Sequence, residues 1–479
     1  MKGLGKLVLA AIVMFLPLLA EAKILLPSII DDNMVLQQQS EIMLWGSAEP
    51  DSGIQVSVSW DGKTYKTMSD GTGKWSVKCR TIEAGGPYEI TIRSGKEKVV
   101  LTNVMLGEVW LCGGQSNMDI SFRGLRNQPI ADAAREIIDS EYPDLRLFRV
   151  KRNYNKRQLD DVTGDWCVST SSSAETCSAI GFIFGRMLHL HNKVPVGIIV
   201  SAWGGSKVEA WMSEDKLKAF VGDGLVLNVP DKLAREKANV TPTVLYNAMI
   251  NPIVNYKIKG CLFYQGEANI TRPALYRKLF PAMVQEWREK WGYEFPFYYV
   301  QLAPFGYQNM GWSPEDRQVA FFREVQEQSL KDIPNAGIIS TTDVGALHTI
   351  HPPQKKEVAE RALFMALKNT YGYKGFVAEA PVPKTVEING NKVSIQFANA
   401  PYGISSYGRP MVGFEVAGKD KVFYPAEVSI YGLSTIHVSS ASVPEPVAVR
   451  YCFKNFYEGC IYNNYGIPAL PFRTDDWAE

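Results

Sequence analysis

The middle of this chain alternates between helix-like and strand-like runs, and no other feature of the sequence limits its fold as strongly. Between about residues 104 and 370, helix-like segments precede short apolar runs three times: 179–191 before 196–200, 276–290 before 297–302, and 317–330 before 336–340. Strands that are connected through helices lie parallel in one sheet, and helices cover both faces of that sheet. The alternation therefore predicts an α/β domain with a parallel sheet between two layers of helices.

The segments on either side of this domain have a β pattern. Residues 23–103 contain runs such as 54–60, in which apolar and polar residues alternate between turn signals. Alternation returns from about residue 371, for example at 392–397. A chain of 479 residues has room for two to three domains. We therefore predict an N-terminal β-sandwich domain at 23–103, the α/β domain at 104–370 and a C-terminal β domain at 371–479.

The first residues of the chain have the pattern of a signal peptide. Lys2 and Lys6 flank the start of an apolar run at 7–19, and Ala-Glu-Ala at 20–22 fits a cleavage site. The apolar run is shorter than the roughly 20 residues that a membrane span needs, which disfavours a retained anchor. We expect cleavage after Ala22 and export to the periplasm or the medium.

Charge and cysteine spacing exclude several other classes of protein. With 51 basic and 50 acidic residues, the chain has no general attraction to nucleic acid or anionic membranes. Its seven cysteines are widely spaced and form no C-x-x-C pair, which argues against a zinc site. In an oxidising compartment Cys167 and Cys177, or Cys452 and Cys460, are close enough in sequence to pair, and the odd count leaves at least one free thiol.

A candidate nucleophile follows the strand-like run 109–112. There the sequence reads Gly-Gln-Ser-Asn-Met at 114–118, so that Ser116 comes just after a strand end. Glycines permit a tight turn, and hydrolases of α/β type present a nucleophilic serine at such a place. Ser116 is therefore the serine to test first.

A serine hydroxyl needs a base that removes its proton, and the chain has only five histidines. Two lie on the helix-like segment 179–191 and one lies in the late β region. His348 and His351 follow the strand-like run 336–340, on a loop that should open at the carboxyl end of a strand. Because sites in open α/β sheets gather at that edge, either histidine could be the base.

Two further strand ends carry polar runs. Ser-Ala-Trp-Gly-Gly-Ser at 201–206 follows one apolar run, and Gln-Gly-Glu-Ala-Asn at 265–269 follows another. An acyl-transfer enzyme stabilises a tetrahedral oxyanion with preorganised donors, each contributing about 2.7–4 kcal/mol. A glycine N–H and a side-chain amide are donors of this kind, although Asn269 also suits a helix cap before Pro273.

Together these runs resemble the sequence blocks of the sialate O-acetylesterase family of SGNH hydrolases. Gly-Gln-Ser-Asn-Met, Trp-Gly-Gly-Ser, Gln-Gly-Glu-x-Asn and Ile-His-Pro occur in the order of that family. The runs at 32–37, 246–250 and 469–477 also look like it, so that the resemblance covers nearly all of the mature chain. It implies an SGNH-type α/β/α domain, flanked by the two β regions, and no metal or organic cofactor.

The resemblance also implies roles for single residues. Ser116 would be the nucleophile, and His351, rather than His348, would be its base. The implied oxyanion hole has three donors: the N–H groups of Ser116 and Gly205 and the side chain of Asn269. Adjacent glycines leave the register open, so Gly204 is the alternative to Gly205.

The group that orients His351 is not evident, because the chain departs here from the family pattern. SGNH hydrolases commonly place an aspartate three residues before the histidine, and relatives of this family often place one two before. The chain has His348 and Thr349 there. A backbone carbonyl, Asp343 or Glu267 could accept the hydrogen bond that holds the imidazole.

We expect an exported serine esterase that removes acetyl groups from sugar hydroxyls, most readily from O-acetylated sialic acid. The alternatives are an esterase for plant polysaccharides such as acetyl-xylan, or a carbohydrate-binding protein with weakened catalysis. Sialic acid carries a carboxylate, so an arginine near the site would favour it, and Arg272 and Arg317 are candidates.

Overall fold

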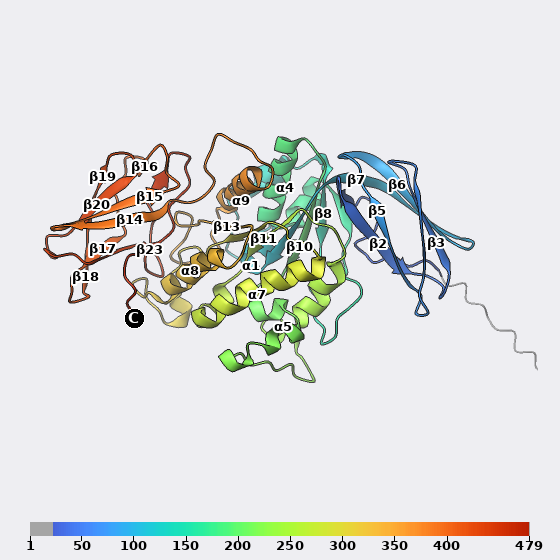
Figure 1. The fold of residues 1–479 in the computed structure, drawn as a ribbon, viewed down its shortest axis with the longest axis horizontal. Coiled ribbons are helices and arrows are strands. Elements are labelled where there is room, and N and C mark those ends of the chain that lie inside the picture. The colour runs from blue at the N-terminus through green and yellow to red at the C-terminus, as the bar shows by residue number, and fades with distance from the viewer. Residues whose placement is uncertain (1–22, 479) are drawn as a thin grey trace, which may run out of the picture.

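The computed structural model describes residues 23–478, in which three regions follow one another along the long axis (Figure 1). An N-terminal β region and a C-terminal β region flank a central α/β region. The predicted signal peptide lies outside the described residues, so export stays a prediction. Within residues 23–478, no helix combines the length and the apolar character that crossing a membrane requires.

The central region is built on a seven-stranded sheet, which confirms the predicted α/β class. In spatial order its strands are β13 (Ala336–Ile339), β12 (Phe297–Val300), β11 (Gly260–Tyr264), β7 (Glu97–Gly114), β10 (Val196–Ala202), β8 (Tyr142–Arg149) and β9 (Trp166–Ser169). All neighbours pair in parallel except β8 and β9, which are antiparallel. The carboxyl ends of the parallel strands therefore share one edge.

Helices cover both faces of this sheet (Figure 1). The long ones are α4 (Ala179–Asn192) and α9 (Lys355–Asn369) on one face, and α7 (Pro273–Trp291) and α8 (Gln318–Gln328) on the other. The shorter helices are α2 (Ala133–Ile138), α3 (Ser171–Thr176), α5 (Glu214–Lys218) and α6 (Arg235–Ala238).

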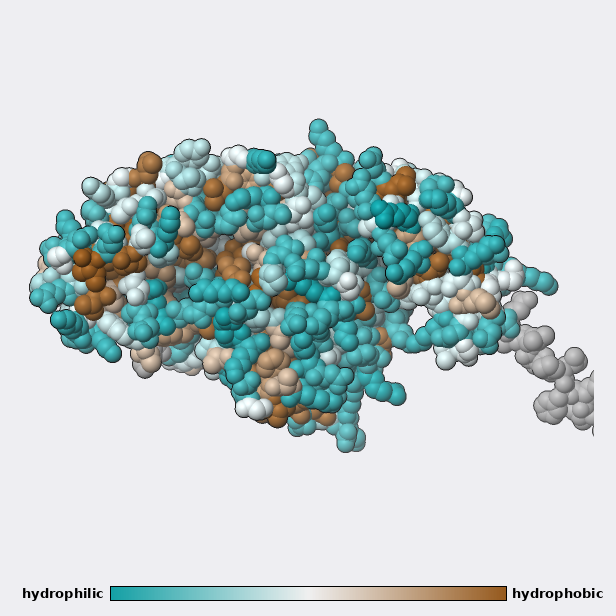
Figure 2. All heavy atoms as spheres, in the orientation of Figure 1, coloured by the Kyte–Doolittle hydropathy of each residue, from teal (hydrophilic) through white to brown (hydrophobic). Residues whose placement is uncertain are grey.

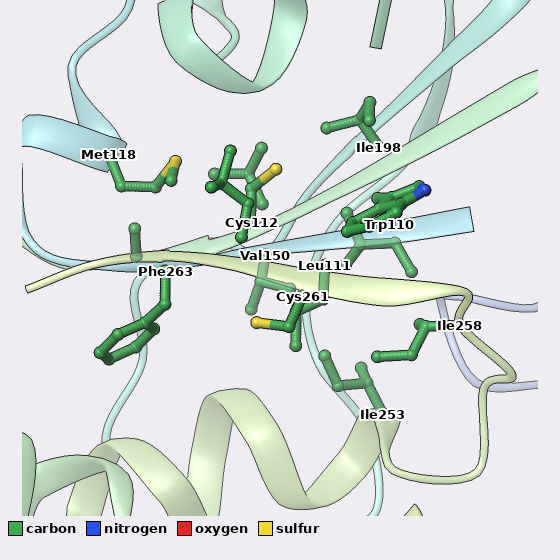
Figure 3. Close-up of a cluster of buried hydrophobic side chains, with 14 of the residues drawn as sticks. Trp110, Leu111, Cys112, Met118, Val150, Ile198, Ile253, Ile258, Cys261 and Phe263 are labelled. Atoms are coloured by element: carbon green, nitrogen blue, oxygen red, sulfur yellow. The ribbon is translucent and has the colours of Figure 1, made fainter. Parts of the chain in front are cut away.

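The strands are apolar runs because both of their faces are buried. On β7, Trp110 packs edge-on against Phe184 of α4, while on β11 Phe263 packs against Phe280 and Trp287 of α7. Figure 3 shows apolar side chains on both sides of the strands, with Met118 and Ile198 above them and Phe263 and Ile253 below. The central strands thereby fix the loops at their carboxyl ends.

The N-terminal region shares a strand with the central sheet. It consists of β1 (Val35–Gln37), β2 (Glu41–Ser47), β3 (Gly53–Val58), β4 (Thr64–Met68), β5 (Lys74–Arg80) and β6 (Gly85–Ser94). The first half of β7 pairs antiparallel with β6, and its second half pairs in parallel with β10 and β11. The boundary that the sequence suggests near residue 103 thus falls inside one strand.

The C-terminal region has a hydrophobic core of its own. Its strands are β14 (Val382–Asn389), β15 (Lys392–Ala398), β16 (Ile404–Ser405), β17 (Phe414–Ala417), β18 (Phe423–Pro425), β19 (Glu427–Tyr431), β20 (Thr435–Ser439), β21 (Ala448–Tyr451), β22 (Tyr462–Asn463) and β23 (Phe472–Arg473). They form two four-stranded sheets and one strand pair. Figure 2 shows apolar residues gathered at the outer end of this region. Its exposed apolar side chains include Val386 and Ile388 of β14 and Ile430 of β19.

All seven cysteines are free thiols. Cys167 is exposed whereas Cys177 is buried, and both Cys452 and Cys460 are buried in the C-terminal region. The two pairings that the sequence spacing permits are therefore not formed in this structure.

Candidate active site

Ser116 begins the short helix α1 (Ser116–Asp119), immediately after the end of β7. The turn requires a glycine at position 114, because its φ is +131° and a Cβ there would lie 2.1 Å from the Tyr264 oxygen. The N–H of Gln115 donates to that same oxygen at 2.9 Å. The turn therefore presses against the end of β11 and presents Ser116 at the carboxyl edge of the sheet.

His351 lies in the loop between β13 and α9, and its Nε2 is 2.9 Å from the Ser116 Oγ. This is the distance between a hydroxyl nucleophile and a base that takes its proton. The other candidate, His348, is exposed. The structure thus brings Ser116 and His351 together from positions 235 residues apart.

The partner of His351 Nδ1 is Gln128, whose side-chain oxygen lies 2.6 Å away. An amide oxygen accepts from Nδ1–H, which leaves Nε2 free to accept from Ser116. Thr349 Oγ1 also donates to this oxygen at 3.1 Å and so helps to fix the glutamine. Sequence reasoning missed Gln128, because no motif marks this uncharged residue in the loop between α1 and α2.

The acidic residues considered for this role make other contacts. Glu267 accepts a hydrogen bond from Asn117 Nδ2 at 2.6 Å. Asp343 forms a bidentate pair with Arg361, with both distances 2.8 Å. Within residues 23–478 neither carboxylate accepts a hydrogen bond from His351, and the acceptor is a side-chain amide rather than an acid or a backbone carbonyl.

Burial, and next the charge of Lys355, lowers the pKa of His351 to about 4. A carboxylate partner would oppose this shift by stabilising the imidazolium, and Gln128 supplies no such charge. The imidazole is therefore neutral at neutral pH, which is the form that accepts a proton from serine.

Asn117 connects the nucleophile turn to the loop of the base. Its Nδ2 donates to Ile350 O at 3.1 Å as well as to Glu267, and its Oδ1 accepts from Lys355 Nζ at 2.6 Å. Burial lowers the pKa of Lys355 to about 7 and raises the pKa of Glu267, while each charge favours the ionised form of the other. One buried side chain thus holds Ser116 in register with His351.

The backbone groups expected to stabilise an oxyanion differ in their position relative to Ser116 and in their exposure. The Ser116 N–H is at the first position of α1, where a helix offers it no internal partner. Gly204 lies against the nucleophile, since a Cβ built on it would be 3.5 Å from Ser116 Cβ. Gly205 follows with a positive φ of +69° and is exposed.

Asn269 is buried and its amide is firmly held. Its Oδ1 accepts from Val208 N at 3.0 Å and from Gln265 Nε2 at 2.8 Å, and its Nδ2 donates to Glu209 at 2.8 Å. These contacts fix which end of the amide is the donor. One of the two Nδ2 hydrogens is committed to Glu209, and the second remains for another acceptor.

Two buried glutamines of the motifs tie three strand-end loops together. Gln115 Oε1, at the end of β7, accepts from Gly266 N at 3.3 Å and from Ala268 N at 3.4 Å. Gln265 Nε2, at the end of β11, donates to Ser206 O at 3.0 Å. The loops after β7, β10 and β11 therefore form one hydrogen-bonded unit.

The two arginines considered for a substrate carboxylate are paired within the protein. Arg272 forms an ion pair with the buried Glu209 at 2.6 Å. Arg317 pairs with Glu415 of β17, in the C-terminal region, at 2.8 Å. Both guanidinium groups thus already have a carboxylate partner.

Comparison with known proteins identifies carbohydrate acetylesterases as relatives of this chain. A family model described as carbohydrate esterase, sialic acid-specific acetylesterase, matches residues 106–361, which include Ser116, Gln128 and His351. The human sialate O-acetylesterase is 31% identical over an alignment of 411 positions, which covers 76% of this chain and 74% of the human protein. The mouse sialate O-acetylesterase is 28% identical over 511 residues and covers 93% of each chain.

A solved structure resembles nearly the whole molecule. A carbohydrate acetylesterase from Xanthomonas citri superimposes with a TM-score of 0.86 at 33% sequence identity. The match covers 95% of this chain and 100% of that one, so all three regions have counterparts in a single known architecture.

Proposed function

The chain belongs to the sialic acid-specific acetylesterase family of carbohydrate esterases and is a carboxylic ester hydrolase, and on this premise we propose that it deacetylates O-acetylated sialic acid with Ser116 as nucleophile. The observation that carries the proposal is the 2.9 Å contact between Ser116 Oγ and His351 Nε2 at the carboxyl edge of the sheet. The curated relatives named sialate O-acetylesterase support the substrate.

In the first half of the reaction, Ser116 Oγ attacks the acetyl carbonyl carbon while its proton passes to His351 Nε2. Gln128 holds the Nδ1–H throughout and so keeps the proton-accepting nitrogen directed at the serine. The tetrahedral intermediate then collapses, its bond to the sugar oxygen breaks, and His351 returns the proton to that oxygen. The products are the free sugar hydroxyl and an acetyl-serine.

In the second half, a water molecule attacks the acetyl-serine and gives its proton to His351. Collapse of the second intermediate releases acetate, and His351 returns the proton to Ser116 Oγ. We assign the oxyanion to the N–H groups of Ser116 and Gly205 and to the side chain of Asn269. Removal of one such donor typically lowers kcat by about 10²–10³.

The substitution Ser116→Ala tests the nucleophile. We expect it to abolish acetate release from 4-nitrophenyl acetate and from O-acetylated sialic acid while circular dichroism stays unchanged. Ser172→Ala, at an exposed serine of α3, is the matched control and should retain full activity. Normal turnover by Ser116→Ala would overturn the assignment.

The two alternatives from the sequence are distinguished by direct measurement. Acetate release from O-acetylated sialic acid, compared with release from acetyl-xylan, separates the two substrate classes. A fluorophosphonate probe that labels the wild type but not Ser116→Ala would exclude a binding protein with an unactivated serine. The carbohydrate acetylesterase from Xanthomonas citri supports sugar esters as the broader class.

Export belongs to the same proposal, because it rests on the sequence of residues 1–22. The mature chain should begin at Lys23, which N-terminal sequencing of the protein from the periplasm or the medium would show. A cytoplasmic chain that keeps Met1 would contradict export and leave the esterase assignment untouched.

A further inference from the structure

A cluster of two arginines lies one helical turn from the nucleophile. Asp119 is the third residue after Ser116 in α1, and only 4% of its side chain is exposed. Arg149 forms an ion pair with its Oδ1 at 2.6 Å, and Arg152 pairs with its Oδ2. Residues three apart on a helix lie on neighbouring parts of one face, about 4.5 Å apart along the axis.

The two arginines differ in how completely they are bound. Arg149, the last residue of β8, also donates to Thr176 O at 2.5 Å and to Asp119 O at 3.4 Å. For Arg152, Asp119 is the one hydrogen-bond partner within residues 23–478, and 46% of its side chain is exposed. The Arg149 side chain is exposed to a similar extent, 39%, so the two arginines differ in their hydrogen bonds: Arg149 also binds backbone carbonyls, whereas Arg152 keeps N–H groups that no described residue binds.

The segment that carries Arg152 begins at the edge of the sheet where Ser116 lies. It follows β8, whose carboxyl end shares the edge of β10 and β7. Two residues on, the Tyr154 ring lies 6.2 Å from the Trp203 ring. Trp203 directly precedes Gly204, the glycine that lies against Ser116.

This cluster carries one positive charge more than Asp119 neutralises. Other charges at the site are balanced: Lys355 and Glu267 are bridged by Asn117, and the buried Glu209 pairs with Arg272. An excess guanidinium with free N–H groups matches a carboxylate, which it binds through two parallel hydrogen bonds. A neutral sugar has no group that uses this charge.

We propose that Arg152 binds the carboxylate of an acidic acetylated sugar and thereby determines substrate specificity, while Asp119 and Arg149 hold it beside the nucleophile. The inference rests on the proposed function, since O-acetylated sialic acid is a sugar that carries both an O-acetyl group and a carboxylate. It adds the residue that distinguishes this acid from neutral acetyl esters.

The test compares an acid with its own methyl ester. Acetate release is measured for O-acetylated sialic acid and for the same sugar with its carboxylate methylated, using wild type and Arg152→Gln. We expect wild type to prefer the free acid by about 10–100-fold in kcat/KM, mainly through KM, and the variant to lose this preference. The kcat/KM for the neutral ester 4-nitrophenyl acetate should fall far less in Arg152→Gln.

A matched control removes the same charge nearby. Arg157→Gln alters an exposed arginine of the same segment that has no ion pair within the described chain, and should keep the preference for the acid. An equal loss on acid and methyl ester, or no loss on either, would overturn the role of Arg152 and leave the proposed function standing. Failure of wild type to hydrolyse O-acetylated sialic acid would overturn both.

Discussion

At the scale of single residues, the neutral acceptor of His351 performs only one of the two tasks of a carboxylate. A carboxylate both orients the imidazole and stabilises the charge of the imidazolium, whereas an amide only orients the ring. Gln128 Oε1 fixes the tautomer and the ring orientation through a 2.6 Å contact. It places no negative charge beside the imidazolium that forms when Ser116 is deprotonated. The pKa of His351 therefore stays low, at about 4, and the base remains unprotonated in mildly acidic surroundings.

Substitutions of Gln128 should separate these tasks. Gln128→Ala removes the acceptor, and we expect kcat to fall about 10–100-fold with little change in KM. Gln128→Glu restores an acceptor with a charge that stabilises imidazolium, so the pKa of His351 should rise. The acidic limb of the kcat/KM profile should then move to higher pH than in wild type.

The measurement is a pH profile of 4-nitrophenyl acetate hydrolysis, with Gln158→Ala as the control at an exposed glutamine. Identical profiles for wild type, Gln128→Ala and Gln128→Glu would show that Gln128 has no part in orienting the base.

At the scale of elements, the site is assembled by joining strand ends to the start of a helix. Lys355 is the first residue of α9, and its Nζ reaches Asn117 of α1 at 2.6 Å. Asn117 in turn holds Glu267, which follows β11, and the carbonyl of Ile350, which precedes the base. One amide thereby sets the separation of four segments.

Lys355→Met should break this junction. It leaves the buried Asn117 Oδ1 without its donor and removes the charge that favours the ionised form of Glu267, so we expect a loss of about 1–3 kcal/mol in the free energy of unfolding. It also removes a charge that lowers the pKa of His351, so the acidic limb of kcat/KM should move upward. Urea unfolding and the pH profile measure the two effects.

Lys356→Met, at the exposed neighbouring position, is the matched control and should be nearly neutral. The double variant Lys355→Met with Glu267→Gln removes the lone charge and should regain part of the lost stability. If Lys355→Met is as stable as wild type, the charge of Lys355 makes no net contribution to the stability of this junction.

The strands and the nucleophile of this site are predictable from the sequence, whereas the residue that orients the base is not, for a physical reason. Continuous apolar runs such as 109–112 and 196–200 indicate parallel strands, because strands that are buried on both faces need apolar residues at every position. Ser116 and the two candidates His348 and His351 are found because they follow such runs, and the resemblance to the family then selects His351. Gln128 is not found, since a loop has no periodicity and its partner lies 223 residues away.

At the scale of the whole molecule, the C-terminal region supports the catalytic region from outside the sheet. Asn455 is fully buried, and its Oδ1 accepts from Val319 N, in the first turn of α8, at 2.9 Å. The guanidinium of Arg323, also in α8, donates to the Asn455 and Lys454 carbonyls at 2.9 and 2.8 Å. The C-terminal region thus caps a helix that belongs to another region.

Asn455→Ala should weaken this support. It leaves the buried Val319 N–H without an acceptor, so we expect a loss of about 1–3 kcal/mol in the free energy of unfolding. Urea unfolding checks this result against Asn391→Ala, an exposed position in a hairpin turn. Equal losses in both variants would contradict a specific role for Asn455.

The continuity of β7 has a mechanical consequence. Its pairing passes from β6 to β1 near Leu106 and then to β10 from Glu108 onward, so ladder partners bridge the junction between the two regions. A hinge needs backbone that is free to change its φ and ψ angles, and a paired strand does not offer it. The N-terminal region therefore cannot swing over the nucleophile as a lid, and recombination cannot exchange it at a flexible linker.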